Sequence, residues 1–171
     1  LVNSVNGEES KIKEVLPLVK HYGAAVIGLT MDDDGIPKDA QKRLQIARKI
    51  VEEAQKIGIP PEDVIIDPLA MAISTDHTAA LETLKAFRLI RDELGVNQTM
   101  GASNISFGLP ERHPINGIFL AMAAIHGVTC PILDPTVWEI RRSILITDLL
   151  LGRDKYCMNF ISVYRDKFPQ E

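Results

Sequence analysis

Short apolar runs alternate with longer amphipathic stretches along the whole chain, and this alternation constrains the fold more than any other feature. The runs are bounded by Gly, Pro, Asn or Asp and carry β-branched residues, as buried strands do. They cover residues 1–3, 24–30, 64–67, 99–104 and 128–134. The stretches between them repeat apolar residues at helical spacing. Strands that alternate with helices predict an α/β fold with a parallel sheet.

The expected helices account for most of the remaining chain. Pro17 weakens the first of them, because a proline inside a helix removes one hydrogen bond. The helices are predicted at residues 11–21, 39–57, 76–94, 115–126, 136–151 and 155–165. A TIM barrel of about 250 residues uses about 31 residues for each βα unit, so the 171 residues hold five units. Either an open doubly wound sheet or five-eighths of a barrel fits, and composition does not decide between them.

Composition excludes several classes of function. Apolar residues make up 46% of the chain and the net charge is −4, which is typical of a soluble globular domain. The acidic balance gives no electrostatic reason to expect nucleic acid or a membrane surface as a partner. No segment reaches the roughly 18 apolar residues of a membrane span. Cys130 and Cys157 show neither zinc spacing nor a disulfide framework, so we expect no bound metal and a reducing, cytoplasmic location.

Amide and carboxylate residues recur at the predicted strand ends. Asn3, Asp67, Asn104 and Asp134 all lie where a strand passes into its following loop. In both candidate architectures this edge of the sheet binds ligands. No GxGxxG or GxxxxGK[ST] sequence follows any strand, which disfavours a nucleotide-binding domain.

Each of these residues also has a structural interpretation. Asn104 is equally typical of a turn in which its side chain bonds its own backbone, and Asp67 of an Asp-Pro turn or helix cap. As a functional group, the Asp67 carboxylate can accept paired N–H bonds from a flat heterocycle, and the amide of Asn3 suits a pyrimidinone edge. For Asp134 the helix-capping interpretation is favoured. Phe107 either stacks on a ligand ring or covers the mouth of a barrel.

Several segments together resemble one known family. They are VNS at residues 2–4, AVIGLTM at 25–31, GIPKD at 35–39, IDPL at 66–69, GASNISFGLPER at 101–112, IN at 115–116 and FLAMA at 119–123. In this order they resemble the pterin-binding methyltransferases. That family includes the methyltetrahydrofolate:corrinoid/iron-sulfur protein methyltransferases and the folate module of cobalamin-dependent methionine synthase. It also includes corrinoid methyltransferases of demethylation systems.

The resemblance implies a fold and an activity. The fold is a TIM (β/α)8 barrel of the dihydropteroate-synthase-like type. Residues 1–171 then form one pterin-binding methyltransferase domain that holds strands four to eight and a C-terminal helix, without the first three units. The implied enzyme is a methyltransferase that moves a methyl group between N5 of methyltetrahydrofolate and the cobalt of a corrinoid. The folate is its small-molecule substrate, and the corrinoid is carried by a partner protein.

The resemblance also implies roles for individual residues. Asn3 and Asp67 match residues that hold the pterin ring, and Asn104 matches a catalytic asparagine that bonds N5. Arg112 matches an arginine beside the pterin pocket. Phe107 stands where the corrinoid/iron-sulfur subgroup has a polar amide and is closer to the methionine synthase pattern.

Three alternatives remain open. A dihydropteroate synthase-like enzyme is expected to carry Ser-Arg-Lys near the seventh strand, where this chain has ASNIS at residues 102–106. A barrel enzyme with another small substrate fits the same fold. A non-catalytic barrel fragment is the third, because five strands leave unpaired edges. We expect an isolated fragment to show little or no activity and to form a homo-oligomer.

Overall fold

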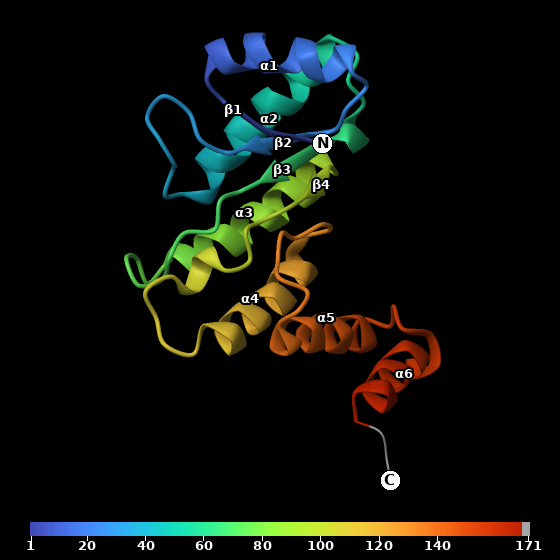
Figure 1. The fold of residues 1–171 in the computed structure, drawn as a ribbon. Helices are drawn as coiled ribbons and strands as arrows, with labels where there is room; N and C mark the ends of the chain where they lie inside the picture. Colours follow the sequence, from blue (N-terminus) through green and yellow to red (C-terminus); the bar gives the residue numbers. More distant parts are fainter. Residues whose placement is uncertain (169–171) are drawn as a thin grey trace.

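The computed structural model describes residues 1–168 and contains four parallel strands in one sheet, each followed by a helix (Figure 1). The strands are β1 (Val2–Asn6), β2 (Val26–Leu29), β3 (Val64–Asp67) and β4 (Asn97–Gln98). The helices are α1 (Glu9–His21), α2 (Ala40–Lys56), α3 (Ala79–Leu94), α4 (Arg112–His126), α5 (Trp138–Leu150) and α6 (Met158–Lys167). Short 3₁₀ turns are η1 (Pro61–Asp63), η2 (Asn104–Ser106) and η3 (Lys155–Cys157).

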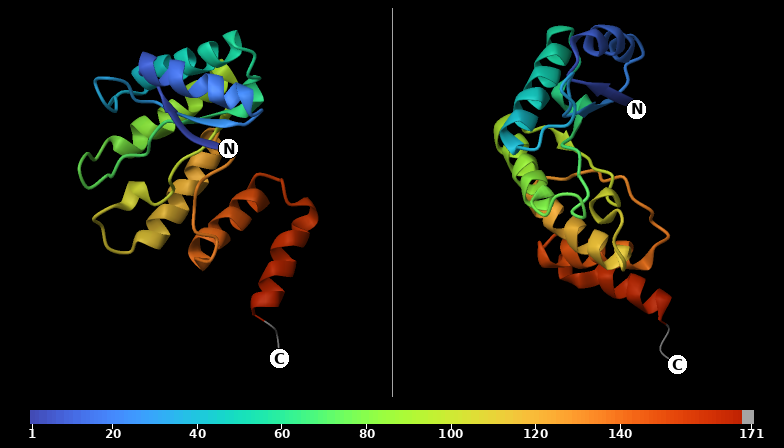
Figure 2. Two further views of the ribbon diagram at one scale, coloured as in Figure 1. Left: turned by 45° about the horizontal axis from the view of Figure 1, so that its top comes forward. Right: turned by 90° about the vertical axis from the view of Figure 1, so that its left-hand side faces the viewer.

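The strands are paired in the order β1-β2-β3-β4, so each strand lies beside its neighbour in sequence. Because crossovers between parallel strands are right-handed, an order without reversal puts the connecting helices on one face of the sheet. A doubly wound sheet instead reverses its order and covers both faces. The sheet therefore has the arrangement of consecutive barrel units, which follow one another from one end of the molecule to the other (Figure 2).

The register of the strands separates two faces of the sheet. Val26 pairs with Val64 and Gly28 with Ile66, and these rows pack against α2 in a buried apolar core. At Gly28 a side chain would meet Ile66 and Ile50, so glycine lets α2 approach the sheet. Because side chains alternate along a strand, the intervening rows point to the opposite face. Asp67, which pairs with Leu29, lies on that opposite face.

Most predicted helices are confirmed, with ends displaced by a few residues. In α1 the helix continues through Pro17, which is exposed, although a proline there removes one helix hydrogen bond. Asp39 caps α2 by accepting a hydrogen bond of 2.8 Å from the Lys42 backbone N–H. Pro114 lies in the first turn of α4 and Gly127 follows its last residue, as predicted. Pro135 does not open a helix, because α5 begins only at Trp138.

The last two predicted strands differ from the prediction: β4 (Asn97–Gln98) lies ahead of the expected residues 99–104, and no strand is assigned in residues 128–134. β4 ends at Gln98, whose buried side-chain amide donates to the carbonyls of Phe87 (3.0 Å) and Gly127 (3.3 Å). Beyond it, one parallel bridge joins Gly101 to Ile132. Backbone bonds from Ala102 N to Ile132 O (2.9 Å) and from Ile132 N to Met100 O (2.8 Å) hold the two segments together. The sheet thus contains four strands, and the predicted fifth is a hydrogen-bonded segment beside β4.

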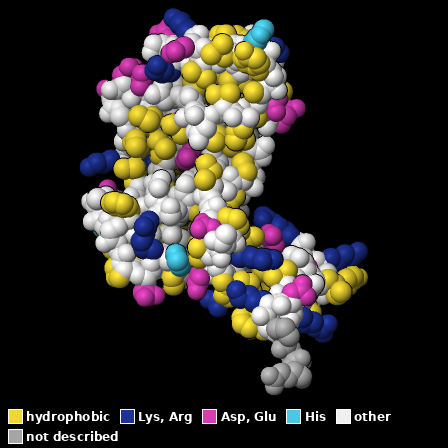
Figure 3. Space-filling view, viewed as in Figure 1, with side chains coloured by type: hydrophobic (Ala, Val, Ile, Leu, Met, Phe, Trp, Pro, Cys, Tyr) yellow, Lys and Arg dark blue, Asp and Glu magenta, His cyan; other side chains and the backbone are white. Residues whose placement is uncertain are grey.

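A second apolar core fixes this end of the molecule. Phe87 of α3, Leu120 of α4 and Ile140 of α5 pack around Met100 and Ile105. On the face drawn in Figure 3, Lys and Arg side chains are interspersed with Asp and Glu, so no large patch of one sign appears there. Within residues 1–168, no helix combines the length and apolar character needed to cross a bilayer.

The two faces of β3 lead to a stability prediction. Ile66 is fully buried against α2, whereas its neighbour Ile65 is only half-buried on the opposite face. Ile66→Ala should lower the free energy of unfolding by about 2–5 kcal/mol, because it leaves a cavity in a packed core. Ile65→Ala is the matched control and should have a clearly smaller effect in urea denaturation. Equal effects of the two substitutions would contradict the assignment of faces.

Candidate functional site

Asp67 is the last residue of β3, as predicted, and its side chain is almost buried, with 8% exposed. Its Oδ1 accepts a hydrogen bond of 2.8 Å from the Leu69 N–H, so the turn interpretation is also correct. Burial raises the pKa of the Asp67 carboxyl to about 6, while the Leu69 hydrogen bond and the charge of Arg43 act in the opposite direction. None of the hydrogen bonds within residues 1–168 involves Oδ2, so the carboxylate can accept donors from a ligand.

Arg43 of α2 is the residue that supports Asp67, and the sequence analysis missed it. Its side chain is 1% exposed. Nε donates to the Pro37 carbonyl (2.8 Å), and Nη1 donates to the Leu69 carbonyl (3.2 Å) and to Thr83 Oγ1 (3.1 Å). Leu69 has a φ of 64°, a strained value for a residue with a side chain. Arg43 therefore holds the strained residue whose N–H binds the Asp67 carboxylate.

A signal for Arg43 was present in the sequence. It lies four residues before Ala47 and seven before Ile50, which places it on the same helical face as these two core residues. A cation on a buried face must be paired or fully hydrogen-bonded. Burial lowers the pKa of Arg43, and the carboxylates of Glu82, Asp39 and Asp67, in that order, raise it.

Asn104 begins the turn η2 and is exposed. The turn is formed by backbone bonds, from Asn104 N to Gly101 O (3.2 Å) and from Phe107 N to Asn104 O (3.2 Å). The amide of Asn104 lies over Gly101, where an added Cβ would be 3.0 Å from Nδ2, so glycine makes room for it. None of the side-chain hydrogen bonds in the described part of the chain involves this amide. The predicted turn at Asn104 is therefore present, but backbone hydrogen bonds form it. The Asn104 side chain takes no part in the turn and is free to bind a ligand.

The loops that carry Asp67 and Asn104 are bonded to each other. In the loop after β3, Ile73 N donates to Ile105 O (3.0 Å), and Ser74 Oγ donates to Phe107 O (2.7 Å). Both acceptors lie in or directly after η2. The structure therefore brings the Asp67 and Asn104 loops to the same end of the sheet, as the sequence analysis expected.

Arg112 and Phe107 flank this turn. Arg112 Nε donates to Ser106 Oγ (3.1 Å), and its Nη2 donates to the Ser103 carbonyl (2.8 Å). The guanidinium carbon is 5.9 Å from the centre of the Phe107 ring. Phe107 itself is 67% exposed, so its ring is available for stacking. Arg112 thus braces the turn that presents Asn104.

Asn3 is not at a strand end, and this part of the sequence analysis is wrong. β1 continues to Asn6, whose side chain is occupied by bonds with Glu8: Nδ2 donates to Oε1 (2.7 Å), and Oδ1 accepts from the Glu8 N–H (3.1 Å). Asn3 pairs with Ile27, and Leu29, two residues further on, pairs with Asp67. Asn3 is therefore exposed on the same face of the sheet as Asp67, but deeper along the strands.

Asp134 has a structural role, although not as a helix cap. Its Oδ1 accepts from the Thr136 N–H (2.9 Å) and hydroxyl (2.6 Å), two residues before α5 begins. These bonds, the hydroxyl one first, lower the pKa of Asp134. Within residues 1–168, no group of three or more His, Cys, Asp or Glu side chains has the arrangement of a metal site.

Comparison with known proteins gives concordant matches. The family described as pterin binding enzyme matches residues 1–134. The chain is 35% identical over 168 residues to the methylcorrinoid:tetrahydrofolate methyltransferase of Eubacterium limosum, which covers 96% of this chain and 62% of that protein. It is 36% and 33% identical to the methionine synthases of Mycobacterium tuberculosis and Mycobacterium leprae, over 70% of this chain and 11% of each synthase. The chain thus spans less than two thirds of the length of these relatives.

The raised pKa of Asp67 predicts an unusual effect on stability. The folded protein holds this proton more tightly than the unfolded chain, whose carboxyl keeps its ordinary pKa of 3.8. The buried charge therefore destabilises the fold progressively as the pH rises from about 4 to 6, and fully above that range. Asp67→Asn should make the ligand-free protein more stable at pH 8, by up to about 3 kcal/mol, because one pKa unit corresponds to about 1.4 kcal/mol.

Urea denaturation of the ligand-free protein at pH 4 and pH 8 measures this effect. The gain should be largely lost near pH 4, because the folded protein then holds the carboxyl protonated and the unfolded chain, at its ordinary pKa of 3.8, is only partly ionised. Asp33→Asn, at an exposed carboxylate, is the control and should show no comparable gain. A variant Asp67→Asn that is less stable than the wild type at pH 8 would show that the carboxylate is needed for the fold itself.

Proposed function

The chain belongs to the family of pterin-binding enzymes, and from that premise we propose that it binds the pterin ring of tetrahydrofolate and takes part in methyl transfer. The methyl group moves between N5 of methyltetrahydrofolate and the cobalt of a corrinoid. A partner protein carries the corrinoid, so the corrinoid is a substrate of this enzyme. The observation that carries this proposal is the free amide of Asn104, on a turn bonded to the loop of a buried carboxylate.

In this proposal Asp67 fixes the orientation of the pterin. The ring presents an N–H and an adjacent amino group on one edge, and a carboxylate can accept both in parallel. Burial strengthens such charge-assisted bonds, since little water competes for the same atoms. With a pKa of about 6, the Asp67 carboxyl is largely ionised at neutral pH and can act as this acceptor. Asn3, on the same face of the sheet, supplies a further donor and acceptor to the ring.

Asn104 acts at N5. A tertiary amine is a poor leaving group, so the C–N bond breaks readily only when N5 carries a proton. The bond pair then passes to N5, which keeps that proton as N–H, while the methyl group passes to Co(I). The Asn104 amide cannot titrate near neutral pH, but it can turn its oxygen toward a protonated N5. It stabilises the charge in the transition state rather than supplying the proton.

The whole of residues 1–171 forms one domain in this account, the later part of an eight-stranded barrel with strands four to eight. The unreversed order of the four strands supports it. β1 lies at one edge of the sheet, where no strand of the described chain pairs with its outer side. Further strands, or a second copy of the chain, would pair with this edge and enclose the face that carries Asn3 and Asp67.

Replacing Asn104 tests the proposal. In the full-length protein, Asn104→Ala should lower the rate of methyl transfer by about 10²–10³-fold, as loss of one hydrogen-bonding group that stabilises transition-state charge does. The Kd for methyltetrahydrofolate, from calorimetry, should change only a few-fold, because Asp67 still holds the ring.

Asn97→Ala is the matched control, since this amide lies at the start of β4 and donates to Glu62 O away from the proposed site. It should leave both the rate and the Kd near the wild-type values. Equal losses of rate and affinity in Asn104→Ala would reject a role at N5.

A further inference from the structure

A cavity of about 700 Å³ lies between the loop that follows β2 and the loop that follows β3. This volume is within the range of small-molecule sites. Its wall combines an apolar part with a cationic part. The residues that line it include Ile36, Lys38, Met71, Ile73, Ser74 and His77.

The cavity shares walls with the candidate site. Ile73 and Ser74 line it, and they are the residues whose N–H and hydroxyl bond Ile105 and Phe107 of the Asn104 turn. Arg43 also lines it and donates to Leu69 O, next to Asp67. A ligand held between Asp67 and Asn104 therefore has this cavity beside it, with Ile73 and Ser74 next to its Asn104 end.

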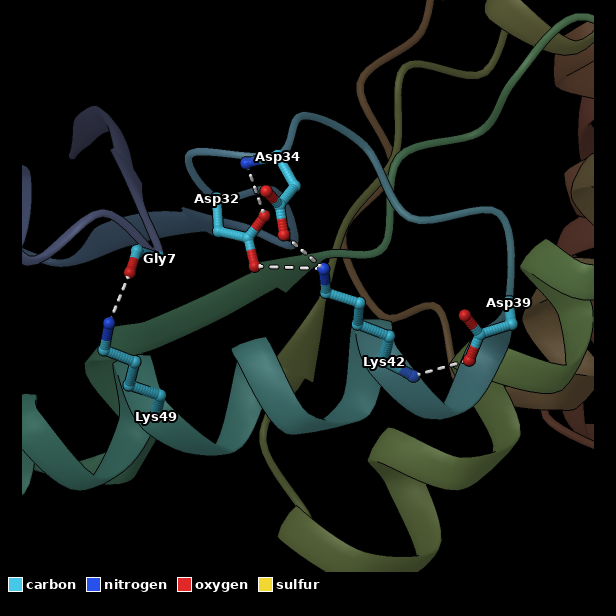
Figure 4. Close-up of polar contacts among 6 residues, drawn as sticks. All are labelled: Gly7, Asp32, Asp34, Asp39, Lys42 and Lys49. Carbon is cyan, nitrogen blue, oxygen red and sulfur yellow. Dashed lines mark hydrogen bonds and ion pairs between the residues drawn. The ribbon is translucent and has the colours of Figure 1, made fainter.

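Lys38 supplies a charge that nothing within residues 1–168 neutralises through an ion pair. Lys42, four residues further on, differs: its Nζ lies 2.9 Å from Asp34 Oδ2 and 3.7 Å from Asp32 Oδ2 (Figure 4). The one carboxylate in the cavity wall, Asp76, accepts hydrogen bonds from the hydroxyl (2.6 Å) and the N–H (2.9 Å) of Thr78. These bonds, and to a lesser extent the charge of Lys38, lower the pKa of Asp76, but Lys38 forms no direct ion pair with it. Lys38 is thus available to an anionic group in the cavity.

We propose that this cavity binds the benzoylglutamate tail of the folate, with the benzoyl ring against Ile36, Met71 and Ile73 and the glutamate carboxylates toward Lys38 and His77. This inference rests on the proposed function. In a folate the tail is attached at C6, the ring atom next to N5. If Asn104 bonds N5, the tail leaves the pterin beside the turn that contacts Ile73 and Ser74. Apolar side chains then cover the benzoyl ring, and the exposed lysine meets the charged end.

The test compares two ligands, methyltetrahydrofolate and 5,6-dimethyltetrahydropterin, which has the same ring without the tail. Their Kd values are measured by calorimetry on the full-length protein and on Lys38→Gln. The substitution should weaken folate binding about three- to fivefold, as loss of a partly exposed ion pair does. It should leave the Kd of the tail-less pterin unchanged. Added salt should reduce the difference between wild type and variant.

Lys42→Gln is the matched control. It also removes a lysine charge close in sequence, but Lys42 is already paired with Asp34 and does not line the cavity. It should leave both Kd values unchanged. An unchanged folate Kd in Lys38→Gln, or an equal loss for both ligands, would overturn the tail assignment while pterin binding stands. A wild-type protein that binds neither ligand would overturn the proposed function together with it.

Discussion

The buried guanidinium of Arg43 is the interaction on which the rest of the site depends. A cation this deeply buried is tolerated only if its N–H groups find acceptors, and it finds them on both loops at the carboxyl end of β2 and β3. By holding the carbonyl of Leu69, it fixes a residue in a strained backbone conformation. That residue in turn directs its N–H at the Asp67 carboxylate. The charged side chain of Arg43 on α2 therefore orients the carboxylate of Asp67 at the end of β3.

The ionised carboxylate of Asp67 destabilises the folded protein when no ligand is bound. Burial disfavours its charged form, and neither the Leu69 N–H nor the charge of Arg43 fully compensates. Such a group is characteristic of a binding site, where ligand donors replace the lost water. The Asn104 amide has a similar character, since its turn is built by the backbone and the side chain is left free. Both groups make sense as parts of a site completed by a ligand.

The sequence predicted the parts that depend on local pattern. Helix periodicity gave α2 and α3, and the apolar run ending in Asp67 gave β3. It failed where tertiary contacts decide. Asn3 was expected at a strand end, but pairing with β2 extends β1 by three residues. The strand predicted at residues 99–104 is displaced, because β4 covers Asn97–Gln98 and only an isolated bridge at Gly101 lies between it and the turn at Asn104. Arg43 was overlooked because a charge on a helix is normally exposed, and only its neighbours Ala47 and Ile50 reveal the buried face.

The central claim is that Asp67 and Asn104 contact one and the same pterin ring. NMR of the full-length protein during a titration with methyltetrahydrofolate tests it directly, through the carboxyl carbon of Asp67 and the side-chain amide of Asn104. The account predicts that both signals shift with the same saturation curve. Bound N–H donors should also bring the pKa of Asp67 below its ligand-free value of about 6. A shift of only one signal, or of neither at saturating ligand, would contradict it.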